Sequence, residues 1–268
     1  MMEGAPRWVQ SSLGLLSVRA RRGEVHGLPM QIFDMQREVT SAFRHLQSGM
    51  SSGKVVLRVP GPPEGRVGGA HMVTGGSGGL AMILAGWLAS HGASRIVLSS
   101  RRGRMGAASA ELLSRASLTA ARCDAADASE TLRLTASVLS AWGAGCRTGV
   151  WHTAGVLADG LLRSQTCGSF QRVYGPKAIG GWNLQRAYCT SPVSSCVLFS
   201  SIAALFGAGQ SNYSAANCCL DALSSHRQLC GQACSSVQWG PWARVGMAAG
   251  DAVGARLQRS GIRLIEAA

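Results

Sequence analysis

The chain has 268 residues, 46% of them hydrophobic, and a mean hydropathy of +0.13. This composition excludes an intrinsically disordered chain and can bury one large core or two small ones. The formal net charge is +13, but the arginines are dispersed and are not interleaved with aromatic residues. A nucleic-acid partner is therefore not expected, and the basic surface would suit an acidic protein partner.

Several other protein classes are also excluded. No apolar run approaches the roughly 18 residues that span a bilayer, and the first apolar stretch, Ser11 to Val18, is too short for a secretory signal. The nine cysteines contain no CxxC pair, so no metal site is expected. An odd cysteine count without a secretion signal favours reduced thiols. We expect a soluble intracellular protein, cytoplasmic or organellar, with no membrane partner.

Alternating short apolar runs and longer helical patterns predict the fold. Residues 1–60 end in a strand-like run at Lys54, and the Pro/Gly-rich residues 61–69 predict a linker. The strands expected after it are Ala70–Thr74, Arg95–Ser100, Ser117–Cys123, Gly149–Thr153, Cys196–Ser201 and Ser235–Gln238. The helices expected between them are Leu80–His91, Ala107–Ser114, Ser129–Trp142, Thr166–Ala187 and Tyr213–Cys230. This order predicts an α/β domain over residues 70–250, a Rossmann-type doubly wound parallel sheet with helices on both faces.

A glycine-rich turn follows the first of these strands. The residues TGGSGGL, 74–80, lie where a strand turns into a helix, and a helix N-terminus presents free N–H groups to a pyrophosphate. A tight turn alone could explain the glycines, but the βαβ context favours dinucleotide binding. The candidate cofactor-binding residues of this turn are Thr74, Gly75, Gly76, Ser77, Gly78, Gly79 and Leu80.

The next strand indicates which dinucleotide is bound. It ends in Ser100 and Arg101 and carries no carboxylate, whereas NAD-binding sheets usually place an acidic residue there. A guanidinium suits a 2′-phosphate, which favours NADPH, although the arginine could also belong to a solvated loop. Asp124, at the end of the third strand, is placed to reach the adenine or to cap a helix.

Four further side chains are expected at the carboxyl ends of the sheet. Tyr213 and Asn217 share a helical face, Ser201 ends the fifth strand, and Lys177 lies on the preceding helix. This set suits carbonyl reduction, because a phenol can protonate the developing alkoxide while a hydroxyl stabilises its charge. A nearby lysine cation is expected to lower the tyrosine pKa, and Asn217 could hold a water or orient Lys177.

These motifs resemble a known family. TGGSGGLA, VLSSRRG, CDAAD, HTAGVLADGLL, PKAIGGWNL, LFSSIAALFGAGQSNYSAANCCLDAL and VQWGPW are similar to the ketoreductase domains of modular polyketide synthases and animal-type fatty acid synthases, a branch of the short-chain dehydrogenase/reductases. The resemblance spans residue 68 to about residue 250. It implies catalytic roles for Tyr213, Ser201, Lys177 and Asn217, cofactor contacts at Ala154, Gly155, Pro241 and Trp242, and substrate contacts at Asp159 and Met247.

Two positions depart from the family pattern. Ala81 replaces the last glycine of the turn. The loop before Tyr213 is one residue short, so counting back from Tyr213 favours Ser200 as the catalytic serine, whereas counting from the strand favours Ser201. We prefer Ser201, because a strand fixes side-chain direction while loops absorb deletions.

The resemblance also implies a function. It is the NADPH-dependent reduction of a β-ketoacyl thioester, borne by the phosphopantetheine of an acyl carrier protein, within a synthase of several domains. Leu157-Ala158-Asp159 resembles the LDD motif of B-type enzymes, and no tryptophan precedes Tyr213, so a D-configured hydroxyl is expected. The alternatives are a stand-alone reductase of a small ketone and a catalytically silent structural domain.

The ends of the chain resemble parts of a larger protein. Residues 1–60 are similar to the C-terminal remnant of an enoylreductase domain, carried by AFRHLQSG and GKVVL. Residues 251–268 read as a C-terminal extension that stops abruptly. We therefore expect a fragment of a multifunctional protein whose carrier domain lies elsewhere.

Overall fold

A computed structural model describes most of the chain and divides it into two compact units, Met1–Gly65 and Arg66–Ala268. The described residues are 7–25, 29–35, 38–58, 68–106, 110–143, 145–191, 193–206, 209–247 and 264–266. The predicted linker, 61–69, lies outside them except for its last two residues. Of the predicted extension, 251–268, only residues 264–266 are described.

The first unit is a small α/β element. Its elements are α1 (Arg7–Arg21), β1 (Met30–Asp34), α2 (Val39–Gln47) and β2 (Lys54–Arg58). The two strands pair in parallel, and α2 packs against both of them with Ala42 buried. Sequence reasoning identified only β2, and the apolar residues of the other three elements stay largely exposed.

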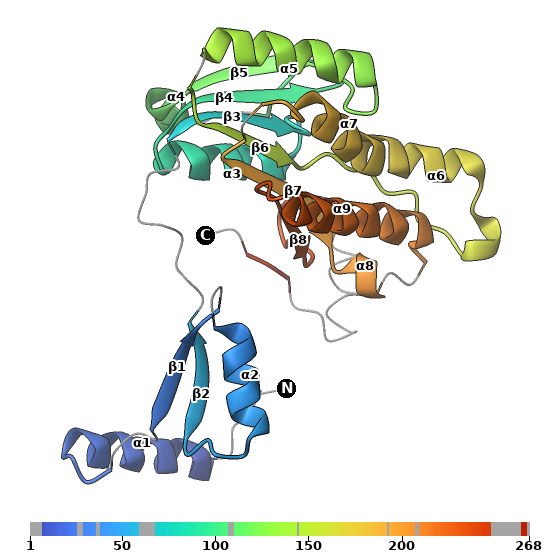
Figure 1. Ribbon diagram of the computed structural model, residues 1–268. Helices are drawn as coiled ribbons and strands as arrows, with labels where there is room; N and C mark the ends of the chain where they lie inside the picture. Colours follow the sequence, from blue (N-terminus) through green and yellow to red (C-terminus); the bar gives the residue numbers. More distant parts are fainter. Residues whose placement is uncertain are drawn as a thin grey trace. The chain divides into compact units, whose positions relative to one another are not determined.

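The second unit contains a six-stranded parallel sheet (Figure 1). Its strands are β3 (Gly69–Thr74), β4 (Ala93–Ser100), β5 (Ser117–Arg122), β6 (Thr148–His152), β7 (Ser195–Ser201) and β8 (Ser235–Trp239). Its helices are α3 (Gly79–Ser90), α4 (Ala110–Arg115), α5 (Ala128–Trp142), η1 (Leu162–Ser164), α6 (Cys167–Tyr174), η2 (Gly175–Ile179), α7 (Gly180–Ala187), α8 (Ala203–Phe206) and α9 (Ser211–Leu229). The strand order β5-β4-β3-β6-β7-β8 reverses between β3 and β6. Such a reversal opens a crevice at the carboxyl ends of the strands.

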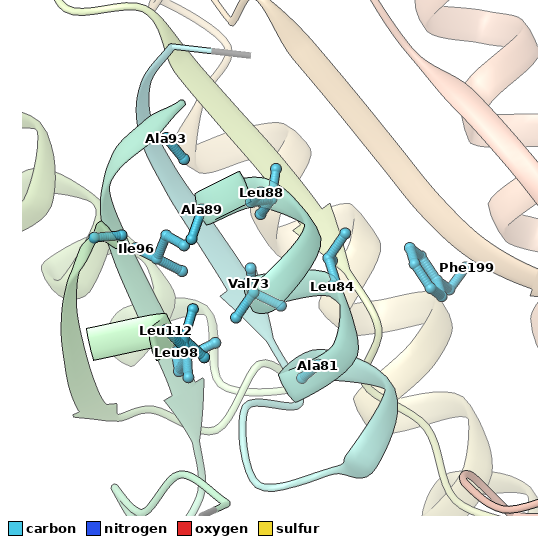
Figure 2. Close-up of a cluster of buried hydrophobic side chains, with 12 residues drawn as sticks. Val73, Ala81, Leu84, Leu88, Ala89, Ala93, Ile96, Leu98, Leu112 and Phe199 are labelled. Atoms are coloured by element: carbon cyan, nitrogen blue, oxygen red, sulfur yellow. The ribbon is translucent and has the colours of Figure 1, made fainter. Parts of the chain in front are cut away.

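Both faces of the sheet are buried, as predicted. Adjacent residues of one strand point to opposite faces, so Val73 packs under α3 while Met72 packs under α5 and α7. Figure 2 shows the first of these clusters, in which Leu84 and Leu88 of α3 meet Val73 across the sheet surface. In Figure 1, α3 lies on the side of the sheet opposite α5 and α7. The Rossmann-type doubly wound architecture is therefore confirmed.

Two predicted helices differ in detail. The expected helix Thr166–Ala187 is a continuous helical path, but a π-helical turn, Gly175–Ile179, separates α6 from α7. The helix expected at Ala107–Ser114 is described from Ala110. Among the described helices, none has the length and apolar character needed to cross a membrane.

A glycine in β6 gives a test of the packing. A Cβ on Gly149 would lie 2.0 Å from Nδ1 of His71, which accepts a hydrogen bond from Trp151 Nε1 at 3.1 Å. Gly149→Ala should therefore lower the free energy of unfolding by about 2 kcal/mol, measured by urea denaturation. The matched control is Gly86→Ala in α3, where the added methyl meets nothing within 4 Å. That change should raise the free energy of unfolding by roughly 0.5–1 kcal/mol. Equal stability of the two variants would contradict the described packing.

Candidate active site

The turn between β3 and α3 requires its glycines. Gly75 has a φ of +76°, and a Cβ there would lie 2.9 Å from Thr153 Oγ1 and 3.0 Å from the Ala154 backbone. A Cβ on Gly76 would lie 2.7 Å from that of Leu98. The N-cap residue of α3, Gly78, makes no side-chain cap, and the first turn carries no acidic residue. The first N–H groups of α3 are thus free to bind an anion.

A groove of about 260 Å³ runs along the carboxyl ends of β3, β4, β5 and β6. The predicted cofactor residues that line it are Thr74, Gly75, Ser77, Gly78, Gly79, Leu80, Ser100, Arg101, Asp124, Ala154 and Gly155. Gly76 does not line it, because it packs on Leu98. Sequence reasoning did not identify eight further lining residues: Ala81, Ser99, Cys123, Ala125, Thr153, Val156, Pro176 and Gly246. All but Gly246 lie within the motifs quoted above, but their contact with the groove depends on the fold, which brings the strand ends, the π-helical turn and the segment after β8 together.

A cavity of about 240 Å³ continues from the groove. Leu80, Thr153, Gly246 and Met247 line both, so the two spaces are contiguous. The other predicted site residues that line the cavity are Lys177, Ser201, Tyr213, Asp159, Pro241 and Trp242. The fold therefore brings three of the four predicted catalytic residues into one space next to the groove, together with both predicted substrate residues and with Pro241 and Trp242.

Lys177 is held in an unusual environment. The π-helical turn carries it under β7, where its side chain is only 3% exposed. Its Nζ donates a hydrogen bond to Phe199 O at 2.7 Å and lies 5.1 Å from the centroid of the Tyr213 ring. Burial lowers the pKa of Lys177 to about 7. Its charged and neutral forms are therefore both populated near neutral pH.

Tyr213 is buried in the first turn of α9, facing the cavity. Burial raises the pKa of Tyr213, while hydrogen bonding to the Asn217 and Ser201 side chains acts in the opposite direction. Sequence reasoning expected the lysine cation to lower this pKa. The net direction for the buried phenol is nevertheless upward, because removing it from water outweighs its polar contacts.

Asn217 supports the tyrosine from behind. Its Nδ2 donates to Tyr213 O at 2.8 Å, one helical turn back, and its side chain is fully buried. Asn217 does not line the cavity, and its Oδ1 is buried with no hydrogen-bond partner. A buried acceptor of this kind needs a donor, which a water or a bound ligand group could provide.

The two candidate serines occupy different positions. Ser200 is buried, and its hydroxyl donates to Asn217 O at 3.5 Å. Ser201 is half-buried, interacts with the Tyr213 side chain and accepts a hydrogen bond from Ala203 N at 3.1 Å. Both line the cavity, but the contact with Tyr213 favours Ser201.

Hydrogen bonds fix the loop after β6 against the start of α9. Gln210 Nε2 donates to both carboxylate oxygens of Asp159, at 3.1 and 3.0 Å. Asn212 Nδ2 donates to Ala158 O at 2.8 Å, and its Oδ1 accepts from Tyr213 N at 2.7 Å. Sequence reasoning missed Gln210 and Asn212, although they lie three residues and one residue before the tyrosine. These contacts set the position of Tyr213 at the helix start.

His152 connects the groove to Lys177. It is fully buried, and burial lowers its pKa to about 4, so the ring is neutral. Its Nε2 faces Lys177 O at 2.8 Å and must carry the proton, which leaves Nδ1 to accept from the Thr74 hydroxyl at 2.7 Å. Thr153 in turn donates to Thr74 O at 2.6 Å. The described residues contain no cluster of three metal-binding side chains.

Comparison with known proteins agrees with this geometry. The family model described as the KR domain matches residues 69–244. The chain belongs to the ketoreductase (KR) domain family. The spectinabilin polyketide synthase system protein NorB of Streptomyces orinoci is 37% identical over 98% of this chain and 12% of its own length. The pikromycin polyketide synthase component PikAII of Streptomyces venezuelae is 37% identical over 97% of this chain and 7% of its own length.

Solved ketoreductase structures share the fold. An A1-type ketoreductase has a TM-score of 0.70 and 36% identity, covering 78% of this chain and 46% of that one. The first ketoreductase of the tylosin polyketide synthase has a TM-score of 0.64 and 37% identity, covering 75% and 44%. The chain thus spans a small part of the curated relatives and less than half of these structures.

The buried amine of Lys177 should make the stability of the fold depend on pH, which can be measured. The pKa of Lys177 is about 7 in the folded chain against 10.5 for an ordinary lysine, so the unfolded chain binds more protons between these values. The free energy of unfolding should therefore rise with pH from 7 towards 10.5, by up to about 1 kcal/mol per pH unit. Lys177→Met removes the titrating group and should lose this rise. Urea unfolding of both proteins at several pH values measures the difference, and parallel stability curves would contradict the buried position.

Proposed function

We propose that the chain reduces a β-ketoacyl thioester, carried on an acyl carrier protein, to the β-hydroxyacyl thioester with NADPH. One observation carries the proposal: Lys177, Ser201 and Tyr213 surround a cavity that continues a glycine-lined groove. A dinucleotide lying in that groove would place its reactive end at the junction of groove and cavity, beside these three side chains.

The residues of the groove fit such a cofactor. The free N–H groups at the start of α3, together with the turn Thr74–Leu80, suit a pyrophosphate. Ser100 and Arg101 suit a 2′-phosphate, since Arg101 is exposed at the rim and can bind a phosphate bidentately. Asp124 is assigned to the adenine, although its Oδ1 also accepts from Ala126 N at 3.0 Å. Ala154 and Gly155 are assigned to the nicotinamide end, with Pro241 and Trp242 beside the ring.

The mechanism assigns proton transfer to Tyr213. When bound, NADPH would supply a hydride to the carbonyl carbon. Tyr213 donates its phenolic proton to the oxygen, and the raised pKa of the buried phenol keeps that proton in place until the oxygen becomes basic. Ser201 donates a hydrogen bond to the same oxygen and stabilises its developing charge.

Lys177 and Asn217 act behind the tyrosine. A protonated Lys177, 5.1 Å from the ring, stabilises the phenolate that remains after proton transfer, which a buried site would otherwise disfavour. The unpartnered Oδ1 of Asn217 is assigned to bind a water, which would return a proton towards Tyr213. Each of the four predicted catalytic residues therefore has one role in the proposed mechanism.

We further propose B-type stereochemistry, giving a D-configured hydroxyl. It rests on Leu157 and Asp159 in the cavity wall and on the absence of a tryptophan in the segment before Tyr213. Met247 is assigned to the substrate side of the cavity mouth. Some similar solved structures are A-type ketoreductases, so chiral analysis of the product decides this point. An L-configured product would contradict the proposal.

The proposal also includes partners. The acyl carrier protein and the other domains belong to a multidomain synthase, as the relatives' names suggest. Residues 1–60 are proposed as the C-terminal remnant of an enoylreductase-like domain. The parallel pair of β1 and β2 with α2 is compatible with a piece of a larger sheet.

Replacing the proposed proton donor tests the function. Tyr213→Phe should lower the rate of NADPH oxidation with a β-ketoacyl thioester mimic by about 10² to 10⁴-fold, while NADPH binding is kept. Tyr174→Phe, on α6 and outside the cavity, is the matched control and should retain activity. Full turnover by Tyr213→Phe would refute the mechanism. Absence of NADPH binding in the wild type would favour a silent domain.

The two serines can be separated in the same assay. Ser201→Ala should lower kcat by about 10² to 10³-fold, because it removes a donor to the developing oxyanion. Ser200→Ala removes a hydroxyl that bonds to Asn217 O, and its effect should stay below about tenfold. The opposite ranking would assign the catalytic role to Ser200.

Adjacent arginines test the cofactor preference. Arg101 lines the groove and Arg102 does not, and both are exposed. Arg101→Ala should weaken NADPH binding by about tenfold or more and leave NADH binding nearly unchanged. Arg102→Ala should change neither binding constant by more than about twofold. Fluorescence titration measures both, and equal effects of the two variants would contradict a 2′-phosphate contact at Arg101.

A further inference from the structure

Two buried thiols lie together on the side of the sheet covered by α9. Cys196, in β7, and Cys234, directly before β8, have their Sγ atoms 3.5 Å apart. Both belong to the cluster formed with Leu198, Leu220 and Leu223. Neither thiol lines the groove or the catalytic cavity, so the proposed reduction leaves this pair without a role.

The backbone around the pair suits a covalent bond. The ladder of β7 and β8 pairs Val197 with Ser235, so Cys196 and Cys234 stand one step before that pair. Neighbouring strands lie about 4.8 Å apart, within the Cα separation of roughly 4.4–6.8 Å found for disulfides. The sulfurs need to approach by only about 1.5 Å to reach bonding distance. No rearrangement of the sheet is required.

The surroundings also activate one of the two thiols. Hydrogen bonding with Cys196 and Ser224, together with the charge of Arg227, lowers the pKa of Cys234 to about 7. Arg227 is itself buried, and its guanidinium donates to Gln185 Oε1 and, at 3.4 Å, to Ala233 O. The pKa of Cys196 is raised, chiefly by its hydrogen bond with Cys234. Cys234 is thus the thiol that ionises and reacts first.

Cys234 is buried but directly follows an exposed segment. Its residue is 7% exposed, and the segment before it, residues 230–233, is mostly exposed where α9 ends. A small uncharged oxidant can reach such a sulfur more easily than a bulky peptide disulfide.

We propose that Cys196 and Cys234 form a modification site that a hydroperoxide oxidises to a disulfide. The Cys234 thiolate attacks one oxygen of hydrogen peroxide, which breaks the O–O bond and gives a sulfenic acid and hydroxide. The Cys196 sulfur then attacks the Cys234 sulfur, forming the S–S bond and expelling the oxygen as water. In total, two thiols lose two electrons and two protons to the peroxide, which becomes two molecules of water.

A disulfide between Cys196 and Cys234 should change the stability of the fold. It closes a loop from residue 196 to residue 234 that contains α9 and Tyr213. It also joins β7 and β8 at the ends away from Ser201 and Trp239, which border the cavity. Oxidation should therefore stabilise the fold and leave the groove unchanged. The melting temperature should rise by roughly 5 °C or more.

Differential alkylation of the full chain tests the site. The reduced chain is treated with hydrogen peroxide, quenched with catalase, and its free thiols are blocked with N-ethylmaleimide in denaturant. After reduction, newly freed thiols are labelled with iodoacetamide and mapped by mass spectrometry. The second label should appear at Cys196 and Cys234 together, in a chain that runs as a monomer on a non-reducing gel. The second label at other cysteines only, with this pair blocked by N-ethylmaleimide, would overturn the proposal.

Variants and melting give a second readout. Cys230→Ala removes an exposed thiol four residues from Cys234 and should leave both the labelling and the melting shift intact. Cys196→Ala should abolish the shift on oxidation. The proposed stabilisation would be contradicted if oxidation raised the melting temperature of Cys196→Ala as much as that of the wild type. It would also be contradicted if the wild type formed the disulfide without any rise in melting temperature.

Discussion

The buried hydrogen bond from Lys177 Nζ to Phe199 O is the contact on which the rest of the site depends. Taking an ammonium group out of water costs several kcal/mol, in the range of about 3–5 when a buried charge lacks compensation. The lowered pKa of the amine reflects this cost. The hydrogen bond to a backbone carbonyl of β7 offsets part of it. The π-helical turn is what makes the reach possible, because it displaces Lys177 from the regular path of α6 and α7.

The backbone of Lys177 also couples the groove to the cavity. His152 binds the carbonyl of Lys177 on one side and the hydroxyl of Thr74 on the other, so the glycine turn and the amine share one rigid connection. From the opposite direction, Asn212 and Gln210 hold the start of α9 on the loop after β6. Tyr213 is therefore fixed from two sides, and a shift at either would move the phenol relative to both Ser201 and Lys177.

Local patterns predicted the sheet, its helices and the lining of the groove, because strand ends in a parallel sheet meet at one edge. They could not reveal His152 or Asn212, whose importance lies in partners that only the fold brings together. The π-helical turn was also hidden, since Gly175–Ile179 continues a helical pattern. The net direction of the Tyr213 pKa could not be predicted, because burial, which a sequence does not show, exceeds the effect of nearby polar groups. The choice between Ser200 and Ser201 required the contact with Tyr213.

The account centres on one reaction, the reduction of a β-ketone by NADPH, in which Tyr213 supplies the proton to the oxygen. Its most direct test uses NADPH carrying deuterium at the transferable position of the nicotinamide, mixed with a β-ketoacyl thioester and the full chain. The account predicts a β-hydroxyacyl thioester with one deuterium on the β-carbon, detected by mass spectrometry and NMR. A chain that binds NADPH and the thioester yet leaves the ketone unreduced, or a hydroxyl product without deuterium, would contradict it.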